Sequence, residues 1–252
     1  LLSPHRGRHG PAGPGMGHHA VSGGDLATIE AIAHIRSPFS SKFGVPRQSG
    51  LVADLRATVV FCPKYRSREA VRGLEGFSHI WLIWRFHQAV RENWSPTVRP
   101  PRLGGNQRVG VFATRSPFRP NALGLSAVRL EGIAYDPELG PVLHVAGADL
   151  MDGTPIFDIK PYVPYADSYP DSTGGFADQV ERQTLHIVFP PELLEQIPAE
   201  HREALTGVLA QDPRPSYQDD PERVYGMDFA GYNVRFAGAG DTLRVCGVEH
   251  LH

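Results

Sequence analysis

Short runs of apolar residues, each ended by Gly, Pro, Asp or Ser, fill the first two thirds of the chain. Runs of this length that are β-branched or alternate between apolar and polar positions are typical of β-strands. They predict strands at residues 28–35, 51–61, 79–86, 109–113, 123–135, 142–150 and 155–159. Only residues 67–74 show a helical pattern in this part. The predicted fold class is therefore mainly β or α+β, with a barrel-like antiparallel sheet whose loops form the site.

The pattern changes after residues 165–175, where Asp, Ser, Pro and Gly accumulate. Such a stretch is typical of a domain boundary. Beyond it, the pattern predicts a strand at residues 184–189, a helix at 191–210 that is interrupted at Pro198, and strands at 224–237 and 242–248. We therefore predict a barrel domain over residues 25–168 and a small α+β domain over residues 169–252.

Residues 1–24 contain ten Gly and Pro residues and no acidic residue, so they bury too little apolar surface to fold. We interpret this segment as a disordered tail or a tag remnant, and discount its histidines as metal ligands. The longest strongly apolar stretch, residues 79–86, is far shorter than the roughly 20 residues that span a membrane. Cys62 and Cys246 are too few for a disulfide framework, which favours a reducing cytoplasm.

Charge is distributed unevenly along the 252 residues, although the net charge is only -2. Residues 36–119 contain 15 Lys and Arg but four Asp and Glu, whereas residues 169–252 contain six and 14. A strongly basic segment attracts a polyanion such as RNA. An excess of arginine on solvated faces, reflecting genome composition, explains the same counts. Charge alone leaves both interpretations open.

The chain lacks the sequence motifs that are typical of several enzyme classes. Residues 238–243 approach G-x-G-x-x-G, but the third glycine is missing and a strand pattern follows. The sequence also has no Walker A motif, no H-E-x-x-H, no G-x-S-x-G and no zinc deaminase signature. A doubly wound nucleotide-binding fold, a kinase, a common hydrolase and a base deaminase are therefore disfavoured.

Polar residues between Pro and Gly are concentrated in five stretches, at residues 43–48, 86–88, 100–106, 112–126 and 149–162. Loops held in this way present fixed backbone donors and acceptors, which suits a small zwitterionic ligand. In their order and sequence these stretches resemble the TrmO family, also called TsaA-like or YaeB-like. The resemblance runs from about residue 32 to residue 165, and continues weakly at residues 212–217.

The resemblance implies a β-barrel methyltransferase that uses S-adenosylmethionine and methylates N6 of threonylcarbamoyladenosine next to the tRNA anticodon. It also implies a homodimer whose partner is the tRNA anticodon stem-loop, with no role for DNA or a membrane, and a C-terminal domain that takes part in tRNA recognition. The cofactor contacts of the family fall on Pro46, Arg47, Gln48, His87, Gln88, Arg115, Leu125, Asp152, Gly153, Thr154 and Pro155.

Residues of the right type to contact tRNA are Arg119, Lys160, Arg214 and Tyr217. The sequence does not identify a general base; the candidates are Asp152, Asp158 and His87. No metal site is predicted, since the spacing of His34, His79 and His87 follows no ligand pattern and argues against a metal-dependent hydrolase.

Structural alternatives accompany these assignments. Arg115 and Arg119 are also suited to bracing a Pro-rich loop, and Asp158 and Lys160 alternate with apolar neighbours as on the solvated face of a strand. The indoles at positions 81 and 84 suit the core or a dimer interface better than base stacking. A non-catalytic nucleotide- or RNA-binding module of the same fold is the alternative function.

Overall fold

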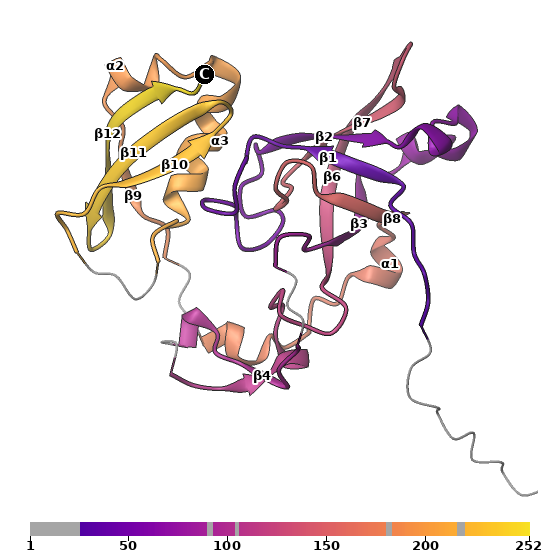
Figure 1. Ribbon diagram of the computed structural model, residues 1–252, viewed down its shortest axis with the longest axis horizontal. Coiled ribbons are helices and arrows are strands. Elements are labelled where there is room, and N and C mark those ends of the chain that lie inside the picture. The colour runs from indigo at the N-terminus through magenta and orange to yellow at the C-terminus, as the bar shows by residue number, and fades with distance from the viewer. Residues whose placement is uncertain (1–25, 90–92, 104–105, 180–182, 216–219) are drawn as a thin grey trace, which may run out of the picture.

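The computed structural model describes residues 26–89, 93–103, 106–179, 183–215 and 220–252. It contains a β-barrel and, beside it, a smaller sheet that carries helices (Figure 1). The tail predicted at residues 1–24 lies outside the described residues.

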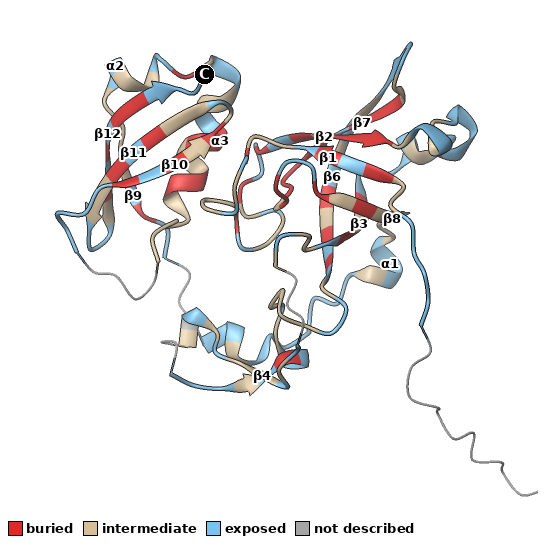
Figure 2. Ribbon diagram, in the orientation of Figure 1, coloured by how far each residue is buried: buried red, intermediate tan, exposed pale blue. Residues whose placement is uncertain are grey.

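Six antiparallel strands close the barrel in the order β1-β2-β7-β6-β3-β8, with β8 pairing back to β1. The strands are β1 (Ala33–Arg36), β2 (Arg56–Phe61), β3 (His79–Arg85), β6 (Leu123–Asp136), β7 (Gly140–Ala146) and β8 (Pro155–Pro161). Buried residues recur along the barrel strands (Figure 2). In the barrel core, Ile35, Val59, Leu82, Leu143 and Ile156 are fully buried. The predicted β-barrel is confirmed.

Shorter elements connect these strands. They are η1 (Pro63–Tyr65), η2 (Arg68–Val71), η3 (Leu74–Gly76), β4 (Thr97–Val98), η4 (Pro101–Leu103), β5 (Val109–Gly110), η5 (Val111–Ala113), α1 (Pro164–Asp167) and η6 (Gly175–Gln179). The helix predicted at residues 67–74 is wrong, because Gly73 has a φ of 86° and separates two short 3-10 turns. The strands predicted at 28–35 and 51–61 begin later, at Ala33 and Arg56.

The smaller sheet has the strand order β10-β11-β12-β9. Its elements are β9 (His186–Val188), α2 (Pro191–Leu194), α3 (Ala199–Ala210), β10 (Tyr225–Phe229), β11 (Tyr232–Ala239) and β12 (Thr242–His250). The predicted strand at 224–237 is two strands, because Ala230 and Gly231 have φ values of 51° and 83° and form a tight hairpin turn. Strand β9 pairs parallel to β12, and the others are antiparallel.

The C-terminal sheet shares its hydrophobic core with the loop between β1 and β2. Phe39, Val52 and Leu55, from the segment between β1 and β2, are buried in the same cluster as the apolar residues of α3 and β10–β12. The backbone N–H of Ala230 donates to the Pro38 carbonyl at 2.8 Å. The long β1–β2 loop is therefore fixed by the C-terminal sheet.

Three long connections leave the barrel at the same end. Because β1 is antiparallel to β2 and β8, and β3 is antiparallel to β6 and β8, their registers place Arg36, Arg85 and Pro155 at one rim. The loops β1–β2, β3–β6 and β7–β8 all start or end at this rim. They carry nearly all the residues for which a cofactor role is predicted.

Close packing at this rim leads to a stability prediction. A Cβ atom added at Gly124 would lie 2.3 Å from Cε2 of Trp84, whose indole is buried. We expect Gly124→Ala to lower the free energy of unfolding by about 1–3 kcal/mol, and the melting temperature by several degrees. Gly132→Ala, in the same strand with no atom within 4 Å of the added Cβ, is the matched control. Equal melting temperatures for the two variants would contradict this packing.

Candidate cofactor site

Arg115 and Gln48 connect two of the three loops at the rim. Arg115 Nη1 donates a hydrogen bond to Gln48 Oε1, so the β3–β6 loop meets the β1–β2 loop. The Arg115 side chain is otherwise exposed. Its guanidinium therefore stands at the rim with donors available for an anionic group.

Asp149, in the β7–β8 loop, connects the same region to the barrel wall. Its Oδ1 accepts a hydrogen bond of 2.6 Å from Ser126 Oγ, and Ser126 Oγ accepts one of 2.9 Å from Trp84 Nε1. Ser126 is fully buried and adjoins Leu125 in β6. The backbone N–H of Ser49, in the β1–β2 loop, lies close enough to this carboxylate to lower its pKa. One carboxylate thus joins β6, the β1–β2 loop and the β7–β8 loop.

Burial raises the pKa of Asp149 above its ordinary value of 3.8. The hydrogen bond from Ser126, the backbone N–H groups of Asp149 and Ser49, and the positive charge of Arg115 oppose this rise in pKa. The carboxylate is held by donors on several sides in a partly dehydrated position. Such an arrangement is common at functional sites.

The segment from Asp152 to Pro155 is fixed to the end of β1. Asp152 Oδ1 accepts from the Ser37 backbone N–H at 3.0 Å. Gly153, with a φ of 73°, donates its backbone N–H to the Ile35 carbonyl at 2.8 Å. Thr154 is buried and donates its hydroxyl to the Met151 carbonyl, while Pro155 begins β8. Asp152 is exposed, and none of the described residues donates a hydrogen bond to its second oxygen.

The remaining predicted cofactor residues also lie at or near the rim. His87 and Gln88 follow β3, where Phe86 donates its backbone N–H to the Ala122 carbonyl at 2.9 Å. Leu125 is 56% exposed on β6, on the opposite face of the strand from the buried Ser126. Arg47 is exposed and Pro46 is buried in the loop that holds Gln48. The structure shows their positions, and their cofactor contacts stay a prediction.

Two of the residues predicted to contact tRNA have structural partners. Arg119 Nη1 donates to the carbonyls of Thr114 and Ser116 at 2.9 and 3.3 Å, and so braces its own loop. Lys160 pairs with Asp158 at 3.3 Å, and its β-partner is Trp81. Since β8 starts at the rim, Lys160 lies toward the opposite end of the barrel.

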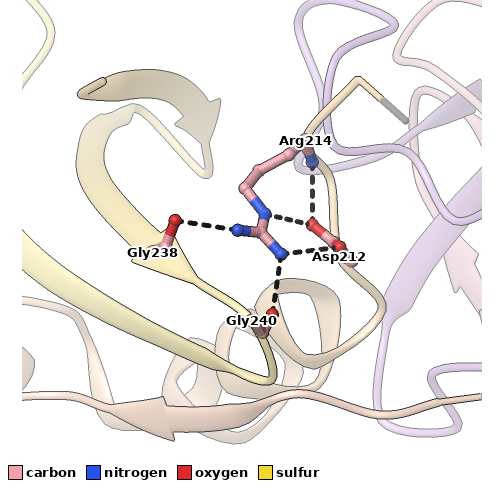
Figure 3. Close-up of polar contacts among 4 residues, drawn as sticks. All are labelled: Asp212, Arg214, Gly238 and Gly240. Atoms are coloured by element: carbon pink, nitrogen blue, oxygen red, sulfur yellow. Dashed lines mark hydrogen bonds and ion pairs between the residues drawn. The ribbon is translucent and has the colours of Figure 1, made fainter. Parts of the chain in front are cut away.

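Arg214 is engaged by the C-terminal sheet (Figure 3). Its guanidinium donates to both Asp212 oxygens, at 2.7 and 2.9 Å, and to the carbonyls of Gly238 and Gly240 at 2.9 and 3.3 Å. Only 11% of its side chain is exposed. These bonds fix residues 212–214 to the β11–β12 turn. Tyr217 lies outside the described residues.

The candidate bases differ in position. Asp152 and His87 lie at the rim, whereas Asp158 lies within β8 and accepts a hydrogen bond from the next backbone N–H. Asp149 and Ser126 lie at the edges of two of the polar stretches, residues 149–162 and 112–126, and the sequence predicts no role for either. The apolar pattern around Ser126 was the available signal, because a hydroxyl inside a barrel strand needs a polar partner.

Within the described residues, no group of three His, Cys, Asp or Glu side chains is placed to hold a metal ion. His34 lies 3.7 Å from Cys62, and His79 bonds Ser78. A membrane-spanning helix of sufficient length and apolarity is likewise missing from the part of the chain that the structure describes.

Comparisons with known proteins match both the barrel and the C-terminal sheet. The family model described as "tRNA-methyltransferase O N-terminal domain" matches residues 34–168, and the "TrmO C-terminal domain" model matches residues 182–251. The tRNA (adenine(37)-N6)-methyltransferase of Escherichia coli K12 is 43% identical over 229 residues, which cover 88% of this chain and 97% of the relative.

Two further relatives come from Pseudomonas aeruginosa. RcsF, whose name describes an S-adenosylmethionine-dependent methyltransferase, is 44% identical over 234 residues, covering 88% of this chain and 97% of that protein. A crystal structure of TrmO has a TM-score of 0.72 at 36% identity, and the match covers 89% of this chain and 98% of that one. The chain therefore belongs to the tRNA-methyltransferase O (TrmO) family.

Proposed function

We propose that this protein methylates N6 of adenine 37 in tRNA with S-adenosylmethionine, and that the adenosine already carries a threonylcarbamoyl group. The observation that carries the proposal is the 43% identity to a named tRNA (adenine(37)-N6)-methyltransferase across 97% of that relative. Family membership makes the protein a methyltransferase that uses S-adenosylmethionine. That the substrate adenosine carries a threonylcarbamoyl group is what the resemblance to the family implies.

The residues at the rim fit this cofactor. When bound, S-adenosylmethionine supplies an electrophilic methyl group on a sulfonium. Arg115 would bind the carboxylate of its amino-acid end, because a guanidinium forks onto a carboxylate. Asp152 would accept hydrogen bonds from its amino or ribose groups, and the exposed Leu125 would cover its base. Such positioning of reactants accounts for up to roughly 7–11 kcal/mol of catalysis in favourable cases.

The acceptor nitrogen also has to lose a proton. The neighbouring carbonyl withdraws electron density from N6, so a base or a water molecule held by a base assists the transfer. Among the candidate bases, the rim position of Asp152 and His87 supports them over Asp158. The target base would leave the stack of the anticodon loop to reach this rim.

The proposal includes a homodimer that works in the cytoplasm on the anticodon stem-loop. Exposed apolar side chains support self-association. Trp94 is 53% exposed, Phe112 is 73% exposed and Leu123 is 39% exposed. The ring centroids of Trp94 and Phe112 lie 6.2 Å apart. Light scattering at micromolar concentration that gives the mass of one chain would refute the dimer.

The reaction is tested by nucleoside mass spectrometry. Two tRNA pools, one with threonylcarbamoyladenosine and one without, are incubated with the protein and S-adenosylmethionine. We expect a gain of one methyl group on threonylcarbamoyladenosine only. A methyl group on the unmodified pool would refute the prerequisite. Cofactor binding without methylation of either pool would refute catalysis and favour a binding module of the same fold.

A further inference from the structure

A groove on the outside of the barrel contains basic residues for which the cofactor site has no use. It has a volume of about 450 Å³ and lies between strands β1, β2, β6 and β7 on one side and α3 with the β10–β11 turn on the other. Its lining includes Arg36, Arg56, Thr58, His144 and His201. The register places Arg36 beside Thr58, and Thr58 beside His144, so these side chains form one row across three strands.

The single acid in the lining is already neutralised. Glu131 accepts from Arg56 at 3.2 Å and from Arg129 at 2.8 Å, and 24% of its side chain is exposed. Arg56 keeps 66% of its side chain exposed despite this pair. Arg36 is exposed, and its side chain donates no hydrogen bond to any of the described residues. Asp136 lies within electrostatic range of Arg36, but its carboxylate is bound by two backbone N–H groups.

The groove is continuous with the rim that carries the cofactor loops. Ser37 lines the groove, and its backbone N–H donates to Asp152 at 3.0 Å. The other wall is fixed as well, because Ala230 in the groove lining bonds the Pro38 carbonyl. A polyanion whose reacting base sits at the rim would therefore find two exposed guanidinium groups along its path: Arg36, and Arg56 with the donors that its single bond to Glu131 leaves available.

We propose that this groove binds backbone phosphates of the substrate RNA next to the target base, with Arg36 and Arg56 as the main contacts. The inference rests on the proposed function and adds to it the surface that holds the tRNA. Guanidinium groups fork onto phosphate oxygens, and the Thr58 hydroxyl is a further donor. Because phosphate contacts carry no sequence information, the groove positions the RNA and does not select its sequence.

The test compares two double variants in tRNA binding. The first, Arg36→Gln with Arg56→Gln, removes both charges of the groove. The matched control, Arg244→Gln with Arg72→Gln, also removes two exposed arginines. The Arg244 side chain has no hydrogen-bond partner among the described residues, and Arg72 pairs with a single acid, Glu69. We expect the groove variant to bind tRNA about tenfold more weakly, with a slope of log Kd against log salt reduced by about 1–2.

Further measurements separate this proposal from the proposed function. Unchanged S-adenosylmethionine affinity and melting temperature in the groove variant show that the rim and fold are intact. If the groove variant has the same tRNA affinity and salt slope as the control variant, the proposed phosphate contacts are refuted, even if methylation is normal. Arginine-dependent tRNA binding by a protein that transfers no methyl group would instead support the groove and refute the proposed function.

Discussion

Replacing Arg115 with alanine is expected to weaken S-adenosylmethionine binding about 10- to 100-fold, which corresponds to the 1.5–3 kcal/mol of a charge-assisted hydrogen bond. Arg115 is exposed at the rim and bonds Gln48, so the substitution removes a ligand contact and leaves no buried group unsatisfied. Calorimetric titration with the cofactor measures the loss. The melting temperature is expected to stay unchanged.

The variant Gln48→Leu separates two contributions of Arg115: its contact with the cofactor, and the orientation that Gln48 gives to its guanidinium. It keeps the guanidinium but removes the acceptor that fixes it, so we expect a smaller loss of affinity than for Arg115→Ala. Arg72→Ala, on the short η2–η3 segment beyond the other end of the barrel, is the control for removal of an exposed arginine. Arg115→Ala with wild-type cofactor affinity would show that the Arg115–Gln48 pair only braces the two loops.

Replacing Asp149 with asparagine is expected to lower kcat/KM about 100-fold, since small displacements of a positioned site have effects of this size. Asparagine keeps an acceptor for the Ser126 hydroxyl but loses the charge that faces Arg115. The loops that meet at this carboxylate would then lose their common anchor. Steady-state kinetics and cofactor titration of the variant measure the effect, and wild-type values for both would refute the anchoring role.

The stability of the same variant has a defined pH dependence. Burial raises the pKa of Asp149 in the folded protein, so unfolding releases a proton between the ordinary value of 3.8 and the raised value. The contribution of this group to wild-type stability is complete below the ordinary pKa and is lost as pH rises through the raised pKa. The melting temperature of Asp149→Asn minus that of the wild type should therefore increase with pH over this window and then level off. A pH-independent difference would contradict the burial of this charge.

Local patterns predicted most of the barrel but not its internal connections. Alternation in β3 and in the first half of β6 reveals which residues face the interior, because each of these segments has one buried face. Resemblance identified the loops at the rim. The contact between Asp149 and Ser126 spans 23 positions, and that between Ser126 and Trp84 spans 42. Such contacts depend on which strands become neighbours, which no local pattern contains.

In the C-terminal half, too, local sequence patterns do not predict the contacts between distant residues. The motif at residues 212–217 predicts a contact with RNA, and that role stays a prediction. It does not predict that Arg214 bonds the carbonyls of Gly238 in β11 and of Gly240 in the turn that follows. The hairpin at Ala230 and Gly231 was missed because alanine rarely adopts a positive φ. In both places, tertiary contacts decide a conformation that residue type alone leaves open.

The core that the β1–β2 loop shares with the C-terminal sheet affects the order in which parts of the chain fold during synthesis. Phe39, Val52 and Leu55 leave the exit tunnel early, with the first strands of the barrel, but the cluster that buries them includes residues of β10–β12 near the end of the chain. Chains fold from the N-terminus as they are synthesised. The barrel strands can therefore pair first, while the β1–β2 loop with Gln48 reaches its final conformation only when synthesis is nearly complete. A nascent chain would thus acquire its cofactor site last.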